Sequence, residues 1–232
     1  MNTISTTTRP SGATASGALS LTGAARSAAA TVRIDVELAT LGSEAPAPRE
    51  LIPLFHELVR EQGLDDLLID VADYSHVPEG PGLVLVGHDA VISYRDRIGG
   101  PAGQRSLLYS RRRESWRAVE PGSATGVPAA RLRAALRSTL AVAALLEQRL
   151  GERMRWDTRS FDVLLNDRLH APNADAARLA WRPEVEALAA RLFPEAQPRV
   201  VDRGEDPREQ AGFRIEGSAW AEPLEAVLGR LG

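Results

Sequence analysis

Residues 67–87 read LLIDVADYSHVPEGPGLVLVG and carry the clearest indication of the fold. Two nearly continuous apolar runs, 67–72 and 82–87, flank a loop rich in proline and acidic residues. Apolar runs of this length are typical of central strands that are covered on both faces of a sheet. The segment therefore predicts a strand, a loop too long for a tight hairpin, and a second strand that begins at Gly82.

The preceding residues complete a βαββ unit. Residues 32–38 alternate apolar and charged side chains, which predicts a half-buried strand with Arg33, Asp35 and Glu37 on its outer face. A helix is expected over 48–62, where apolar residues recur at three- and four-residue spacing.

The chain continues with strands expected near 90–95 and 106–111, which form a hairpin that extends the sheet, and with a long helix over 128–150. The element order of the first part then recurs, as a strand at 161–165, a helical stretch at 173–193 in which Pro183 begins a second helix, and strands at 199–202 and 212–216.

We therefore predict an α/β protein, with α+β as the alternative class. Two βαββ-like modules share a mixed sheet and are linked by an arginine-rich hairpin and a long amphipathic helix. The expected divisions are a disordered tail at 1–31, the first module with its hairpin at 32–127, and the helix, second module and C-terminal helix at 128–232. The last two divisions could form one compact unit.

Composition excludes several chemistries, because the chain has no cysteine and all 28 of its basic residues are arginine. Iron–sulfur centres, cysteine-ligated zinc and lysine-linked pyridoxal phosphate cannot form. The excess of arginine over lysine, with abundant alanine and glycine, indicates a GC-rich bacterial genome.

The N-terminal residues 1–31 contain twelve serines and threonines, no acidic residue and no apolar run typical of a signal peptide. No stretch approaches the roughly 20 apolar residues of a membrane span. We expect a cytoplasmic protein that does not enter a membrane.

The first candidate site is the strand–loop–strand unit, in which carboxylates and two of the four histidines gather. A carboxylate in an apolar strand must be paired, hydrogen-bonded or functional, which makes Asp70 informative. If the hairpin folds back, oxygen and nitrogen ligands for a divalent metal could converge. The candidate metal ligands are Asp73, His76 and His88, and the candidate catalytic residues are Asp70, Asp73, His76, Glu79 and Asp89. The alternative is a purely structural turn.

The second candidate site is basic, because residues 1–94 carry −7, residues 95–137 carry +7 and residues 138–232 carry −3. Arginines and aromatic residues around the hairpin could bind an acidic protein or an anionic small molecule. The residues expected to do so are Arg105, Arg111, Arg113, Arg117 and Trp116. Nucleic acid is disfavoured by the pI of about 5.9. The alternative is that these arginines pair with the acidic first module on an edge strand.

Two functions follow from these candidates. We favour a non-catalytic binding or assembly protein that uses the arginine-rich hairpin. The alternative is a small-molecule enzyme or ligand-binding protein that uses the 70–89 region, with or without a divalent metal. The sequence does not predict the partner, the substrate or the oligomeric state.

Overall fold

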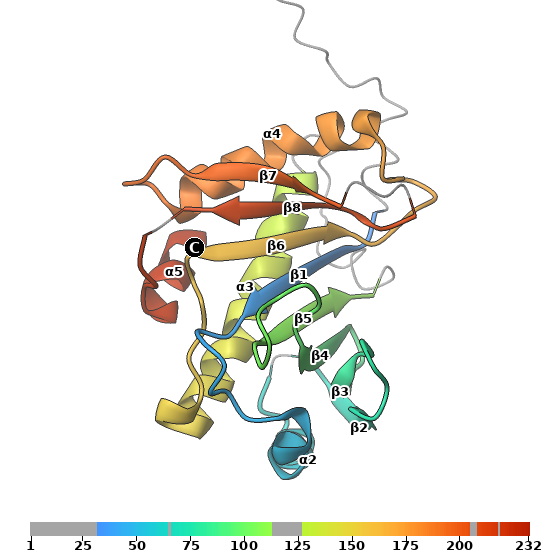
Figure 1. Ribbon diagram of the computed structural model, residues 1–232, viewed down its shortest axis with the longest axis vertical. Helices are drawn as coiled ribbons and strands as arrows, with labels where there is room; N and C mark the ends of the chain where they lie inside the picture. Colours follow the sequence, from blue (N-terminus) through green and yellow to red (C-terminus); the bar gives the residue numbers. More distant parts are fainter. Residues whose placement is uncertain (1–31, 65, 113–126, 205–207, 218) are drawn as a thin grey trace, which may run out of the picture.

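The computed structural model describes residues 32–64, 66–112, 127–204, 208–217 and 219–232. The expected disordered tail at 1–31 lies outside these residues. Over these residues the chain forms one eight-stranded sheet with four α-helices, a mixed α/β fold (Figure 1). The helices are α2 (Ile52–Glu61), α3 (Val127–Leu150), α4 (Asp175–Leu192) and α5 (Leu224–Leu231). The strands are β1 (Ile34–Ala39), β2 (Leu68–Tyr74), β3 (Gly82–Gly87), β4 (Ala90–Asp96), β5 (Arg105–Arg111), β6 (Ser160–Leu165), β7 (Arg199–Arg203) and β8 (Ala211–Glu216).

The strand order is β2-β3-β4-β5-β1-β6-β8-β7, and every pairing is antiparallel. The expectation of a mixed sheet is therefore wrong. In the first half of the sheet, the hairpin β4–β5 folds back so that β5 lies beside β1. In the second half, the hairpin β7–β8 folds back so that β8 lies beside β6. β5 and β4 thus flank β1 on one side, and β8 and β7 flank β6 on the other.

The helices cover one face of this sheet. α3 runs behind β1 and β5, and α4 lies against β7 and β8 (Figure 1). Residues such as Val36, Leu85 and Phe213 point toward these helices and are fully buried. The apolar residues at alternate positions of the strands therefore form the face that packs against the helices. The opposite face, which we call the open face, carries the polar half of β1, β6 and β8. Among the described residues, no helix is long and apolar enough to cross a membrane.

Two local expectations are corrected. β2 is an edge strand instead of a central one: Leu67, just before it, is 60% exposed, and Ile69 within it is 54% exposed. An apolar run alone does not distinguish a central strand from an edge strand whose apolar residues remain exposed. Pro183 lies inside the continuous helix α4, where it begins no new helix.

Gly82 is required where β3 begins. Its φ is 69°, and a Cβ there would lie 2.3 Å from the carbonyl oxygen of Tyr94. This close approach holds β3 against β4 at the end of the long loop.

Candidate functional site

The centre of the open face holds two carboxylates on neighbouring strands. Glu37 of β1 and Asp162 of β6 are direct cross-strand partners, and each residue is 2% exposed. Like charges in this position repel, and burial adds a desolvation cost to each. Both carboxylates therefore need cationic partners.

Glu37 receives two arginines from opposite sides. Arg95 of β4 places Nη2 3.2 Å from Oε1, and Arg203 of β7 places Nη1 3.1 Å from Oε2. The Ser106 hydroxyl also donates to Oε1 at 2.7 Å. Arg203 reaches further, because the same Nη1 atom lies 3.3 Å from Oδ2 of Asp162.

Asp162 receives two more guanidinium groups. Arg214 of β8 donates from Nε and Nη2 at 2.8 and 3.0 Å, the fork geometry that suits a carboxylate. Arg97, from the loop between β4 and β5, donates to Oδ2 at 2.8 Å. Burial opposes ionisation of Asp162, but the Arg214 hydrogen bonds and the nearby positive charges outweigh it and lower its pKa.

The β4–β5 loop is held across the open face, in front of β1 in Figure 1. Arg97 crosses β1 to reach Asp162 and also donates to the Gln104 side chain at 3.2 Å. Gln104 in turn donates to the Thr40 carbonyl oxygen at 3.0 Å. The loop therefore buries Glu37 and Asp162 and adds a positive charge to the site.

Asp35 lies two residues before Glu37 on the same face, but its environment differs. It accepts hydrogen bonds of 2.6 Å from Ser110 Oγ and from Asn166 Nδ2, and Arg33 Nε is 3.7 Å away. Burial raises the pKa of this carboxyl despite these contacts. The same face thus holds one carboxyl with a lowered pKa and one with a raised pKa.

The arginines outnumber the carboxylates they contact. Arg95, Arg97, Arg203 and Arg214 meet Glu37 and Asp162, which leaves a formal charge of +2. The Arg33–Asp35 pair is neutral and does not change this balance. The side chains of Arg203 and Arg214 are 29% and 34% exposed, so a ligand from solvent can reach them.

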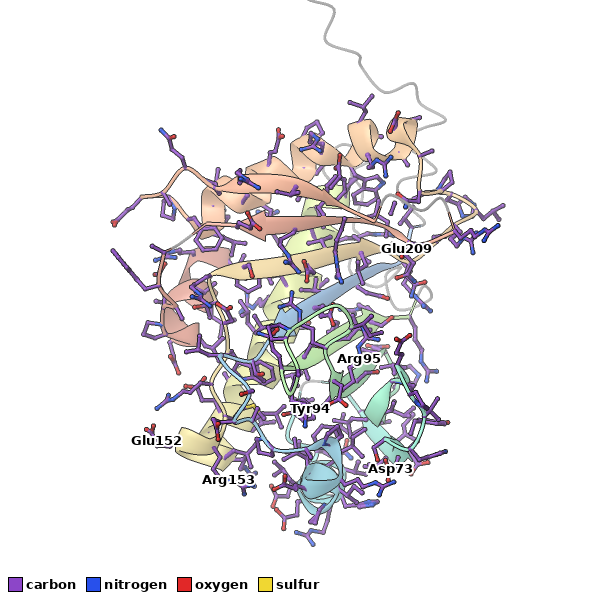
Figure 2. The ribbon with its side chains drawn as sticks, viewed as in Figure 1. Asp73, Tyr94, Arg95, Glu152, Arg153 and Glu209 are labelled. Carbon is purple, nitrogen blue, oxygen red and sulfur yellow. The ribbon has the colours of Figure 1, made fainter. Side chains whose placement is uncertain are left out.

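The predicted 70–89 site is divided between the two ends of β3. Asp70 is exposed and accepts a hydrogen bond from the next backbone N–H, while Asp73 caps the turn by accepting the Ser75 N–H at 2.8 Å. The Ser75 hydrogen bonds lower the pKa of Asp73. His76 and Glu79 are exposed in the same loop, which follows the edge strand β2, and Figure 2 shows Asp73 at the lower edge of the molecule.

His88 and Asp89 follow the other end of β3, about 20 Å along the strand. The structure therefore does not bring Asp73 and His76 to His88. Instead, Asp66 joins His88 and Asp89, with potential ligand atoms within 4.8 Å of one another.

The Asp66 group already has a structural role. The two carboxylate oxygens of Asp66 accept the N–H groups of Asp89 and Ala90 at 2.9 and 3.0 Å, which closes the turn between β3 and β4. Nδ1 of His88 lies 3.0 Å from Asp89 Oδ1. A cation could bind here only in competition with these hydrogen bonds.

The predicted hairpin arginines face acidic neighbours. Arg105 pairs with Asp96, and Arg111 lies 3.8 Å from Asp89; both arginine side chains are largely buried. Arg113, Trp116 and Arg117 lie outside the described residues. The hairpin does contribute to the open face, but through Arg95, which Figure 2 labels, and through Arg97.

Sequence reasoning missed the pairing of Glu37 with Asp162 and the roles of Arg203 and Arg214. A usable signal was present, because charged residues occupy alternate positions in segments predicted as strands of both halves. The strand order that brings them together was not predictable from periodicity.

Comparisons of the chain with protein-family models, with curated proteins and with solved structures found no match. The function has to be inferred from the geometry of the site.

Proposed function

We propose that this chain is a non-catalytic binding protein that recognises an anionic partner on the open face of its sheet. The observation that supports this proposal is the surplus of guanidinium groups, four around two carboxylates. Arg203 and Arg214 are the exposed members and would make the first contact.

The arrangement suits carboxylate or phosphate groups. A guanidinium group offers several N–H donors in one plane, and uncompensated positive charge next to a low-dielectric interior attracts anions strongly. Glu37 and Asp162 hold the arginines in place before a ligand arrives, which reduces the entropy lost on binding. The acidic residues are therefore positioning residues for the arginines.

A catalytic role for the two carboxylates is disfavoured. Each accepts contacts from at least two arginines, and the lowered pKa makes Asp162 a weak proton acceptor. The surroundings of Asp162 therefore suit stable ionisation.

We also propose that the two halves arose by duplication, with a revised equivalence. The order β1, β4, β5 corresponds to β6, β7, β8, and β2 and β3 form an additional hairpin in the first half. Glu37 then corresponds to Asp162, and Arg95 corresponds to Arg203. Each arginine lies two residues further along its strand than the residue that is level, across the sheet, with the corresponding acid. The proposed site would lie where the two halves meet.

Fluorescence anisotropy with a labelled oligoglutamate peptide tests this function. We expect saturable binding that weakens as ionic strength rises from roughly 50 to 200 mM, since salt screens exposed charges. An oligoarginine peptide is the matched probe of opposite charge. No binding of oligoglutamate, or equal binding of both peptides, would refute the proposal.

A further inference from the structure

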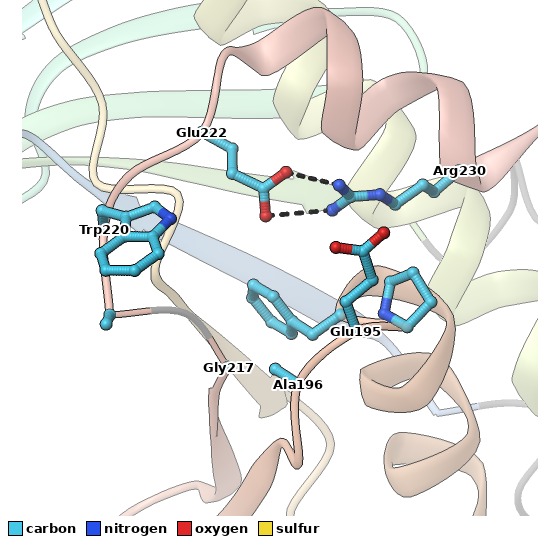
Figure 3. Close-up of a pocket in the computed structure, with 9 residues that line it drawn as sticks. Glu195, Ala196, Gly217, Trp220, Glu222 and Arg230 are labelled. Carbon is cyan, nitrogen blue, oxygen red and sulfur yellow. Dashed lines mark hydrogen bonds and ion pairs between the residues drawn. The ribbon is translucent and has the colours of Figure 1, made fainter.

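A cavity lies away from the open face, where the end of α4, the segment after β8 and helix α5 meet (Figure 3). Its volume is about 490 Å³, within the range of small-molecule sites. Phe193, Glu195, Gly217, Trp220, Glu222 and Arg230 are among the residues that line it.

The wall of this pocket is fixed by close packing. A Cβ at Gly217 would lie 2.0 Å from the Phe193 ring, so only glycine lets the ring lie against the backbone there. Glu222 is anchored through Thr158, whose hydroxyl accepts the Glu222 N–H at 2.6 Å and donates to its carbonyl oxygen at 2.7 Å. The pocket is thus built on a positioned backbone.

The pocket carries a net negative charge. Arg230 pairs with both carboxylate oxygens of Glu222, donates to the Leu192 carbonyl oxygen at 2.7 Å and also interacts electrostatically with Glu195. Two carboxylates therefore share one guanidinium group, and the charged residues that line the pocket sum to a formal charge of −1. A cation therefore suits this pocket, whereas the open face suits an anion.

The opposite side of the pocket is aromatic. The Trp220 side chain lies across the pocket from Glu195 in Figure 3, and the residue is 74% exposed. Large exposed aromatic surface favours stacking with an apolar ligand group. We infer that the pocket binds a small aryl-alkyl ammonium compound, with its ring against Trp220 and its ammonium group at Glu195. This inference does not depend on the proposed function of the open face.

Phenethylammonium is a suitable probe, with the neutral 2-phenylethanol and the anionic phenylacetate as matched compounds. Binding is followed by NMR through the indole N–H of Trp220, assigned with Trp220→Phe, and the backbone N–H groups of Ala196, Gly217 and Ala219. We expect saturable shifts with the amine, weaker binding of the alcohol and no binding of the acid.

Three variants separate the two contacts. Glu195→Gln should weaken amine binding roughly three- to five-fold and leave the alcohol unchanged, because an exposed ion pair is worth little more. Trp220→Ala should weaken both by roughly five- to ten-fold. Glu225→Gln, an exposed glutamate on α5 outside the pocket lining, should change neither. Equal affinity of amine and alcohol in the unmodified protein, or absence of saturable shifts, would overturn the inference.

Discussion

Glu37 and Asp162 face each other on the neighbouring inner strands β1 and β6, and Nη1 of Arg203 lies 3.1 Å from one carboxylate and 3.3 Å from the other. Arg203 belongs to β7, an edge strand, so a single side chain connects the rim of the sheet to its centre. Arg95 reaches Glu37 from the other half. The two halves are therefore joined by electrostatic contacts as well as by strand pairing.

Replacing Asp162, the carboxylate with the most arginine partners, should strongly destabilise the protein. Asp162→Asn leaves three guanidinium groups without their shared partner, and we expect a loss of about 3–5 kcal/mol in the free energy of unfolding, the usual effect of breaking a buried ion pair. Urea unfolding measures the loss. The control is Glu216→Gln, because the Arg199–Glu216 pair is exposed and should contribute about 0–1 kcal/mol. Similar losses in both variants would show that the buried cluster contributes little.

The contribution of Asp35 to the free energy of unfolding should decrease as the pH rises. Its folded pKa is raised above the ordinary value, so the folded state holds the proton more tightly and loses stability as pH rises from about 4 through the folded pKa. Asp35→Asn removes this titration and still offers an acceptor to Ser110. Relative to this variant, the unmodified protein should become less stable as the pH rises above about 4, the ordinary range of an aspartate.

Asp73→Asn is the control of opposite sign. Its pKa is lowered in the folded state, so its contribution is present at neutral pH and is lost as the pH falls through the folded pKa. Unfolding curves recorded for both variants from well below pH 4 up to neutral pH test the assignment, because Asp73 titrates below its ordinary value and Asp35 above it. A pH-independent difference for Asp35→Asn would contradict it.

Because Asp70 lies on the edge strand β2, we expect it to contribute little to the stability of the fold. Because Asp70 is exposed, Asp70→Ala should change the free energy of unfolding by less than about 0.5 kcal/mol. Leu85→Ala, on the neighbouring strand with its side chain fully buried, should cost about 2–5 kcal/mol. Thermal or urea unfolding distinguishes the two, and a large effect at Asp70 would mean that β2 is covered.

Asp66 should behave as a turn residue. Asp66→Ala removes the acceptor of two backbone N–H groups, and we expect a loss of about 1–3 kcal/mol that is the same with and without a chelator. His88→Ala, an exposed member of the same group, is the companion variant and should have little effect. A rise in melting temperature on adding zinc, abolished by either substitution, would instead indicate a metal site.

Local patterns predicted much of the fold. The alternation around Ile34, the long apolar helix ending at Leu150 and the glycine that begins β3 all lie where expected. Long-range strand order was not predictable, because an apolar run such as 67–72 is compatible with an edge or a central strand. The site depended on that order.

Only some residues of the site could be predicted from the sequence. The charged alternation of β1 predicted a face with Asp35 and Glu37, and the basic segment around the hairpin included Arg95. That these groups meet could not be inferred, because Asp162 and Glu37 are 125 residues apart in the chain and come together only through the β1–β6 pairing. Burial also depends on the β4–β5 loop, whose path over the sheet left no sequence signal.

The most direct test of the central claim compares two arginine variants in oligoglutamate binding. Arg214→Gln removes an exposed arginine from the open face, whereas Arg182→Gln removes a similarly exposed arginine on α4 that pairs with Asp202. We predict that Arg214→Gln weakens binding roughly five-fold or more and flattens its salt dependence, while Arg182→Gln leaves both nearly unchanged. Equal effects of the two substitutions would show that binding follows overall charge, and would contradict a specific site on the open face.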